Sequence, residues 1–185
     1  AYVLTGSSTS ISYSSGTTTG TSFRALAIDT GDNNAVTSSL FASANGPGVQ
    51  LLSLANYNTI SQSTMTSANA AYHGLYITAG SSNVFTGDWI YNPAGGAASF
   101  SNAFYNTLTL STVQSNGAGQ TALYLAGSDG NTISSSTLRA PSGYGLQLGV
   151  TARWNLVDLS TMSSSDVSYF ALYVLSGASS NTVTR

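Results

Sequence analysis

The stretch Asn58 to Ala70, NTISQSTMTSANA, decides the fold because the chain repeats its pattern along its whole length. Related stretches begin at Thr9, Asn34, Asn83, Asn106, Asn131, Asn155 and Asn181. The steps between successive starts are 25, 24, 25, 23, 25, 24 and 26 residues. A fixed period of about 20 to 50 residues is the signature of a repeat architecture, in which each repeat is one structural unit.

Apolar residues occupy fixed places in each copy, counted from the first residue, which we call the anchor. One stands two places after the anchor, another stands seven places after it, and an alternating apolar pair precedes it. The two sets after the anchor are Ile11, Val36, Ile60, Phe85, Leu108, Ile133, Val157 and Val183, and Phe41, Met65, Ile90, Val113, Leu138 and Met162. Alternation with period two is typical of strands with one inward face, so each copy predicts three short strands separated by bends.

Three short strands per repeat make one turn of a three-sided coil. We therefore predict an all-β protein, a single-stranded right-handed parallel β-helix of about seven coils of 23–26 residues. Neighbouring coils are expected to stack at about 4.8 Å, the spacing of hydrogen-bonded strands. Residues 1–185 form one domain in this prediction. A solenoid leaves unpaired strand edges at both ends, so we expect either a fragment of a longer repeat protein or end-to-end self-association.

Equivalent residues of successive coils stack on one another, which explains two columns of polar residues in the repeat. The anchor is Asn in seven of eight copies: Asn34, Asn58, Asn83, Asn106, Asn131, Asn155 and Asn181. Five places on, serine recurs as Ser14, Ser39, Ser63, Ser111, Ser136 and Ser160. We interpret both as structural ladders, because stacked amides bond from coil to coil and buried bends need polar partners. Asp88 replaces serine in one coil, as a tolerated substitution or as an acceptor of hydrogen bonds from Ser63 and Ser111.

These coils, N-x-[IVL] followed by [ST]-x-[ML] and preceded by G-L-Y-[IL], resemble right-handed parallel β-helix repeats of the pectate-lyase-like superfamily. Non-enzymatic repeats of NosD-type periplasmic proteins and bacterial surface proteins are closest in style. The resemblance covers essentially the whole chain and implies the fold. It leaves function open, because this architecture hosts lyases, hydrolases, adhesins and spacers.

Aromatic residues recur with a longer period of two coils, about 48 residues. Directly before the anchor stand Tyr57, Tyr105 and Trp154, alternating with Asn33, Ser82, Gly130 and Ser180. Between the paired apolar positions stand Tyr76, Tyr124 and Tyr173, alternating with Gln50, Ser99 and Gln147. One interpretation is that each ring covers a small residue of the next coil. The other is a carbohydrate-binding stripe, because two coils span about 9 to 10 Å, close to the disaccharide repeat of an extended glycan.

Catalytic and metal-binding groups are sparse in this register. Enzymes of the resembled superfamily use clustered carboxylates, and here no two carboxylates of neighbouring coils share a column. Asp129 and Arg153 do share one, which predicts a structural ion pair. Asp29 and Asp32 are either turn formers or a weak calcium site. His73, the only histidine, is expected at the surface without a catalytic role, and we predict no catalytic residue, metal or cofactor.

The amino-acid composition limits the classes of binding partner. Charged residues make up 5% of the chain and the net charge is −2, so nucleic acid and anionic membranes have few cations to contact. No apolar run approaches the length needed to cross a bilayer. Cysteine is absent, which excludes disulfides. A Ser/Thr/Asn/Gly-rich chain without lysine favours a secreted or surface-displayed bacterial protein.

Three functions follow as hypotheses. The first is a non-catalytic extracellular or cell-surface scaffold or adhesion module that contacts glycans through its outward tyrosines. The second is a polysaccharide lyase or glycoside hydrolase of the resembled superfamily. The third is an ice-binding solenoid, suggested by outward hydroxyls that flank the first apolar column: Thr59, Ser61, Thr107, Thr109, Thr132, Ser134, Thr182 and Thr184.

Overall fold

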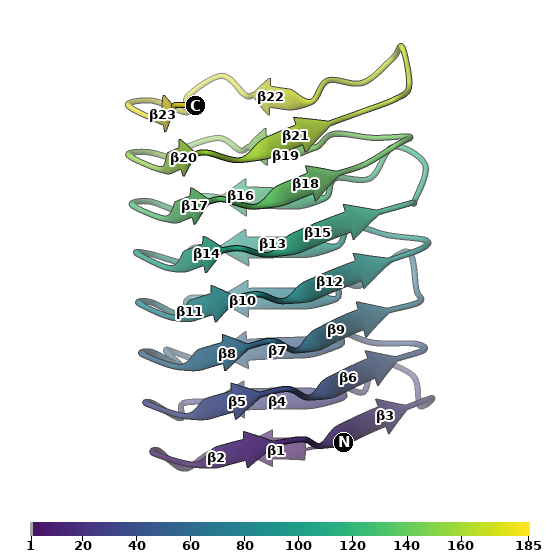
Figure 1. Ribbon diagram of the computed structural model, residues 1–185, viewed down its shortest axis with the longest axis vertical. Helices are drawn as coiled ribbons and strands as arrows, with labels where there is room; N and C mark the ends of the chain where they lie inside the picture. Colours follow the sequence, from purple (N-terminus) through teal and green to yellow (C-terminus); the bar gives the residue numbers. More distant parts are fainter. Residues whose placement is uncertain (1) are drawn as a thin grey trace.

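The computed structural model describes residues 2–185, which form 23 strands and no helix, stacked as a column of coils (Figure 1). Sheet A contains β1 (Tyr2–Leu4), β4 (Leu26–Asp29), β7 (Val49–Leu52), β10 (Leu75–Thr78), β13 (Ala98–Ser101), β16 (Leu123–Ala126), β19 (Leu146–Leu148) and β22 (Leu172–Val174). Sheet B contains β2 (Ser10–Ser12), β5 (Ala35–Thr37), β8 (Thr59–Ser61), β11 (Val84–Thr86), β14 (Thr107–Thr109), β17 (Thr132–Ser134), β20 (Leu156–Asp158) and β23 (Thr182–Val183). Sheet C contains β3 (Ser15–Thr18), β6 (Leu40–Ser43), β9 (Thr64–Ser67), β12 (Trp89–Asn92), β15 (Thr112–Ser115), β18 (Thr137–Arg139) and β21 (Thr161–Ser163).

All the strand pairs are parallel, and they keep the register that the repeat predicts. In sheet B, Ile60 pairs with Val36 on one side and Phe85 on the other. The all-β, three-sided parallel solenoid is therefore confirmed. Sheets A and B have eight strands each and sheet C has seven, which makes about eight coils rather than seven. The incomplete first and last copies account for the difference, because each still supplies strands.

The inward apolar columns form one continuous core along the axis of the solenoid. Its largest side chains, including Phe41, Phe85 and Phe100, are fully buried. Each coil contributes the pair from sheet A and one residue each from sheets B and C. Burial of apolar surface contributes about 25 cal/mol per Å², so the same interior positions are apolar in every complete coil.

The asparagine column lies at the bend between sheets A and B, where the chain turns sharply and backbone groups are buried. From Asn34 to Asn155, each amide Nδ2 donates to the Oδ1 of the next asparagine along the column, at 2.9–3.1 Å. The second Nδ2 proton goes to a bend carbonyl, as from Asn58 to Gly31 at 2.9 Å. Each interior Oδ1 also accepts the backbone N–H of the preceding asparagine, as in Asn34 to Asn58 at 2.9 Å. The column thus fixes both the bend and the coil-to-coil register.

The serine column lies at the bend between sheets B and C and works differently. The hydroxyl of Ser63 donates to the carbonyl of Ser61 at 2.8 Å, which closes its own bend. The same oxygen accepts the backbone N–H of Ser39 in the preceding coil at 3.1 Å. A residue at this place therefore needs both a donor and an acceptor on one short side chain.

Candidate functional site

The two outward aromatic columns differ in their surroundings. We call Tyr76, Tyr124 and Tyr173 the face column, because they stand on the outer face of sheet A. The ring of Tyr124 lies over the next coil, where a Cβ on Gly149 would come within 2.9 Å of it. The ring of Tyr173 stacks on Tyr144, with centroids 4.8 Å apart and planes 17° apart. These rings are half-buried, so much of their surface packs within the protein.

His73 belongs to the surroundings of the face column. Its ring lies 5.4 Å from that of Tyr76, centroid to centroid, and it is half-buried rather than a free surface residue, which corrects the expectation from sequence. Burial lowers the pKa of His73 to about 4. The imidazole is therefore neutral at neutral pH and acts as a flat packing group beside the tyrosine.

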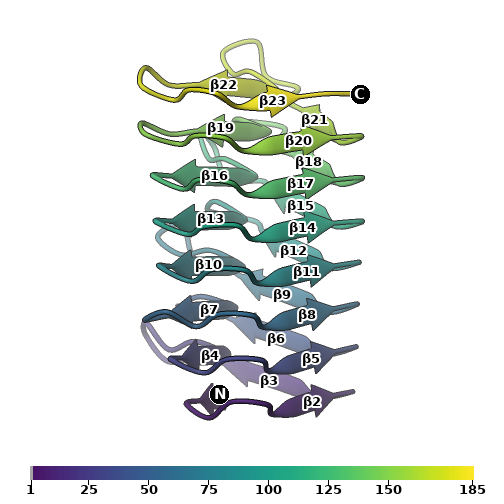
Figure 2. The ribbon, with the colours of Figure 1, turned by 90° about the vertical axis from the view of Figure 1, so that its left-hand side faces the viewer.

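Tyr57, Tyr105 and Trp154 form a second column, which we call the bend column, at the bend between sheets A and B. These bends stack along the left-hand edge of the solenoid in Figure 1 and face the viewer in Figure 2. The three side chains are 61%, 68% and 61% exposed. A Cβ on Gly130 would come within 2.6 Å of the Tyr105 ring, so this ring covers part of the next coil while most of its surface stays open to solvent.

The residues of the bend column adopt the left-handed backbone conformation, with positive φ angles. The φ angles of Tyr57, Tyr105 and Trp154 are 56°, 56° and 52°. The other coils hold the same conformation with the residues Asn33, Ser82, Gly130 and Ser180. Glycine and asparagine suit this region, whereas a bulky residue there costs about 1 kcal/mol. Turn geometry alone therefore does not account for the aromatic residues, which occupy a place where a small residue is locally better.

Sheet B carries two outward hydroxyl columns beside this bend. In the column farther from it, hydroxyls pair with one another: Ser61 donates to Thr37 at 3.1 Å, and Ser134 to Thr109 at 3.0 Å. The nearer column includes Thr59, Thr107, Thr132 and Thr182, and the side-chain hydroxyls of the first three make no hydrogen bond to any group of residues 2–185. Ala35, Val84 and Leu156 interrupt this nearer column, so it is not an unbroken hydroxyl array.

The carboxylates at the bend between sheets A and B accept hydrogen bonds from the backbone. Asp32 Oδ1 accepts the backbone N–H of Asn56 in the next coil at 2.7 Å. Asp129 Oδ1 likewise accepts the backbone N–H of Arg153 at 2.8 Å. The expected Asp129–Arg153 ion pair is thus wrong, because the neighbouring main chain, and not the guanidinium, meets the carboxylate. In residues 2–185 no three His, Cys, Asp or Glu side chains gather as metal ligands.

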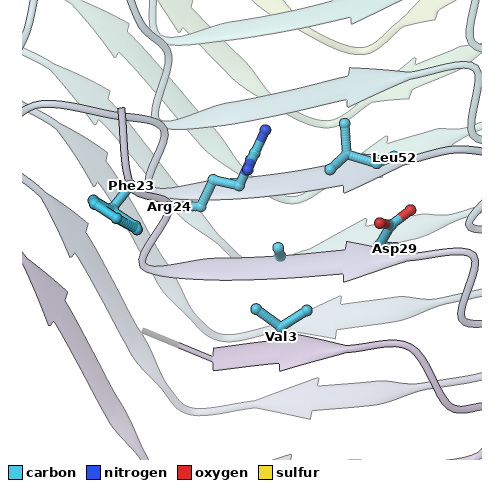
Figure 3. A pocket seen from close by; sticks show the side chains of 6 residues that line it. Val3, Phe23, Arg24, Asp29 and Leu52 are labelled. Carbon is cyan, nitrogen blue, oxygen red and sulfur yellow. The ribbon is translucent and has the colours of Figure 1, made fainter. Parts of the chain in front are cut away.

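A small pocket of about 220 Å³ opens on the outer face of sheet A near its N-terminal end (Figure 3). Its lining is Val3, Phe23, Arg24, Ala27, Asp29 and Leu52. Arg24 and Asp29 lie near opposite ends of β4. The Arg24 Nε donates to the Gln50 side chain. The pocket is largely apolar, with one cation already engaged by a neutral amide.

Asp88 stands in the serine column between β11 and β12, and only 3% of its surface is exposed. Its Oδ1 accepts the backbone N–H of Ser63 at 2.8 Å, and its own N–H donates to the hydroxyl of Ser111 at 3.1 Å. The expected hydrogen bond from Ser111 is therefore reversed in direction. Oδ2 has no hydrogen-bond partner within the described residues. Burial raises the pKa of Asp88 to about 7, against the opposing effect of its backbone hydrogen bonds.

In-register parallel coils around an apolar core, closed by asparagine at one bend and serine at another, define the protein as a three-sided β-solenoid. Residues 24–185 match the family described as the right handed beta helix region, and the chain belongs to this family. No curated protein sequence shows a significant match to it. No helix in residues 2–185 has the length and apolar character to cross a membrane.

Solved structures with the same fold include two that align with most of this chain. The A-module of mannuronan C-5 epimerase AlgE4 from Azotobacter vinelandii aligns with a TM-score of 0.67 and 10% identity, over 98% of this chain and 58% of that one. DFA-IIIase from Arthrobacter chlorophenolicus A6, solved in complex with GF2, aligns with a TM-score of 0.62 and 14% identity, over 87% and 50%. This chain therefore spans about half the length of each of these proteins.

Both aromatic columns are visible in the sequence, but the difference in their exposure is not. One signal for the bend column was available: the residues that alternate with its aromatics are small, and they include Asn33 and Gly130, whose types tolerate a left-handed backbone. The unpaired threonine column beside it had no such signal, because pairing of outward hydroxyls depends on rotamers and on the next coil.

Proposed function

We propose that the protein is a non-catalytic, secreted or cell-surface bacterial β-helix whose outward aromatic residues contact polysaccharide. The observation that carries the proposal is the recurrence of largely exposed aromatic side chains at every second coil, at 61% to 68% exposure. Isolated exposed aromatics are common, but a regular series of them on a charge-poor surface marks an interaction site. Flat rings with a polar edge suit sugar rings, which present both C–H faces and hydroxyls.

The composition and the fold support an extended ligand. The solenoid is straight, and its residues repeat along one axis, so one ligand repeat can meet the same side chain many times (Figure 1). The chain carries four arginines and six aspartates, which leaves little charge for binding nucleic acid. Equivalent sites on a rigid scaffold of this kind would bind successive repeats of one polymeric ligand, and the affinity would increase by multivalency.

The test is a glycan array probed with residues 1–185, followed by titration of the best hits. We expect dissociation constants that fall with oligosaccharide length up to about six sugars, because longer ligands reach successive aromatic rungs. Overnight incubation with the same glycans is expected to leave their chain length and stereochemistry unchanged by NMR. Failure to bind any glycan on the array, with the protein shown to be folded by circular dichroism, would remove the proposal.

An enzyme acting on polysaccharide is the second candidate. It is favoured by the pocket with Arg24 and Asp29 on sheet A, and by the shared fold with an epimerase and with DFA-IIIase. New reducing ends, an unsaturated product or altered C-5 stereochemistry in the incubation above would establish it. Loss of the product in the variants Arg24→Gln and Asp29→Asn would then assign the activity to this pocket.

A further inference from the structure

We propose that the bend column, rather than the face column, is the glycan-binding site, and that its ligand is a neutral, extended β-1,4-linked polysaccharide. This inference rests on the proposed function and names the site and the ligand class within it. The occupant is a single polysaccharide chain lying along the solenoid axis, across the bends between sheets A and B.

Accessibility separates the two columns. Tyr57, Tyr105 and Trp154 offer most of their rings to solvent. In the face column, Tyr173 is already stacked on Tyr144 and Tyr76 packs beside His73. A sugar that stacks on a ring needs a free aromatic face. The bend column provides such faces without any rearrangement of the protein.

The spacing fits one class of glycan. Consecutive members of the bend column are two coils apart, because Thr59 pairs with Val84 and Val84 with Thr107, and the series continues in this way. Two coils correspond to about 9.5 Å, twice the distance between neighbouring strands. An extended β-1,4-linked glycan repeats its ring orientation at nearly this distance, once per disaccharide. Every second sugar would then stack on an aromatic ring.

The neighbouring hydroxyls supply hydrogen bonds. Thr59 and Thr107 each follow an aromatic residue by two places, at the start of the adjoining strand of sheet B, and Thr132 lies on the coil between the last two aromatics. Their hydroxyls lack partners within residues 2–185, unlike those of the farther column. Sugar hydroxyls both donate and accept, and so do threonine hydroxyls. The ring and the free hydroxyl thus occur together twice, as Tyr57 with Thr59 and Tyr105 with Thr107, whereas Leu156 takes the place of threonine beside Trp154.

Charge favours a neutral ligand. Two acidic side chains, Asp32 and Asp129, lie one coil away from members of the bend column, and their carboxylates already accept main-chain hydrogen bonds from Asn56 and Arg153. Arg153, next to Trp154, is the one cation in the bend column's immediate sequence. A uronate at every sugar would meet more negative than positive charge along this edge, which weakens binding. Neutral hexose chains meet no such repulsion.

The backbone gives a further reason. Aromatic residues in the left-handed conformation cost stability at three places where the same protein uses Asn, Ser or Gly in other coils. Bulky residues also adopt this conformation at the bend between sheets B and C, as Leu110 and Leu159 do, so the backbone supports the proposal only together with the exposure and the two-coil spacing of the rings. Binding accounts for rings that local conformational preference disfavours.

The experiment compares two triple variants by isothermal titration with cellohexaose and mannohexaose, and with hexagalacturonate as the acidic comparator. The bend variant is Tyr57→Asn, Tyr105→Asn and Trp154→Asn, which copies Asn33 and keeps the left-handed bend. The face variant is Tyr76→Gln, Tyr124→Gln and Tyr173→Gln, which copies Gln50 and Gln147. We expect the bend variant to bind at least one neutral hexasaccharide about 10-fold or more weakly, since a few exposed aromatics dominate such sites. The face variant is expected to stay within about twofold of the parent.

The outcomes separate the inference from the proposed function. Equal thermal midpoints for the bend variant and the parent, or a higher midpoint for the variant, show that lost binding is not lost folding. If only the face variant loses affinity, the site assignment is overturned while glycan binding stands. If hexagalacturonate binds more tightly than both neutral probes, the ligand class is overturned. If the parent binds no glycan of any kind, the proposed function itself fails.

A third variant tests the hydroxyls: Thr59→Val, Thr107→Val and Thr132→Val, which keeps β-branched side chains in the strands. We expect affinity for the neutral hexasaccharide to fall about threefold to tenfold, because each lost hydrogen bond contributes modestly in water. The matched control is Thr64→Val, Thr112→Val and Thr137→Val on the outer face of sheet C. An equal loss of affinity in both variants would contradict a role of the sheet B hydroxyls.

Discussion

Replacing Asp88 by serine is expected to raise the free energy of unfolding at pH 8 by about 4 kcal/mol. The pKa of this carboxyl rises from 3.8 to about 7 on burial, and each unit corresponds to about 1.4 kcal/mol. The ionised form is disfavoured because Oδ2 is buried without a partner. Serine at this place donates to a carbonyl of its own bend in the other coils, as Ser63 and Ser111 do at 2.8 Å.

The gain depends on pH in a defined direction. Between pH 3.8 and about 7 the folded parent binds more protons than its unfolded chain, so its stability falls as pH rises through this window. Above the window the penalty is complete, and below it both states are protonated. Urea unfolding of parent and Asp88→Ser should therefore show a large gain at pH 8 and a small one at pH 4.

Asp166→Ser is the control, because Asp166 lies outside the buried column and its removal changes the net charge equally. Its free energy of unfolding should stay within about 0.5 kcal/mol of that of the parent at both pH values. A gain for Asp88→Ser that is the same at pH 4 and pH 8 would show that ionisation is not the cause.

The sequence predicts this fold because a solenoid imposes one requirement many times. Every coil needs apolar residues at the same inward places, so Ile60, Phe85 and Leu108 occur in one column and reveal the register by themselves. The polar ladders follow for the same reason. Asn at a bend is conspicuous only when it returns in each coil, and the hydrogen bonds then run between equivalent atoms.

The contacts that the bends make cannot be predicted from the repeat. Register places Asp129 beside Arg153, but the register of Cα atoms does not say which atom of Arg153 the carboxylate meets, and it is the main-chain N–H. The bends between sheets C and A also differ from coil to coil. His73 and Tyr144 reach the face column from these bends, so the burial of its tyrosines depends on loop conformation that no repeat specifies.

Replacing Asn106 by alanine is expected to lower the free energy of unfolding by about 4 kcal/mol. Asn106 is in the middle of the column and fully buried. Its Oδ1 accepts from the N–H and the Nδ2 of Asn83, at 2.9 and 3.0 Å. Its Nδ2 donates to Gly80 O at 3.0 Å and to Asn131 Oδ1 at 3.1 Å. Alanine leaves buried donors and acceptors in two coils without partners, each at a cost of about 1 to 3 kcal/mol.

Two control variants distinguish the stabilising effect of the asparagine ladder from the effect of removing any asparagine side chain. Asn116→Ala removes an exposed amide that contacts Tyr91 and Gln114, and a change below about 0.5 kcal/mol is expected in the same urea titration. Asn181→Ala removes the last, half-buried member of the column, which accepts from Asn155 alone and donates to Ala152 O. Its loss should be smaller than that of Asn106 because water reaches this end of the column. A loss for Asn106→Ala no larger than for Asn116→Ala would mean that packing of the apolar columns, and not the asparagine ladder, holds neighbouring coils in register.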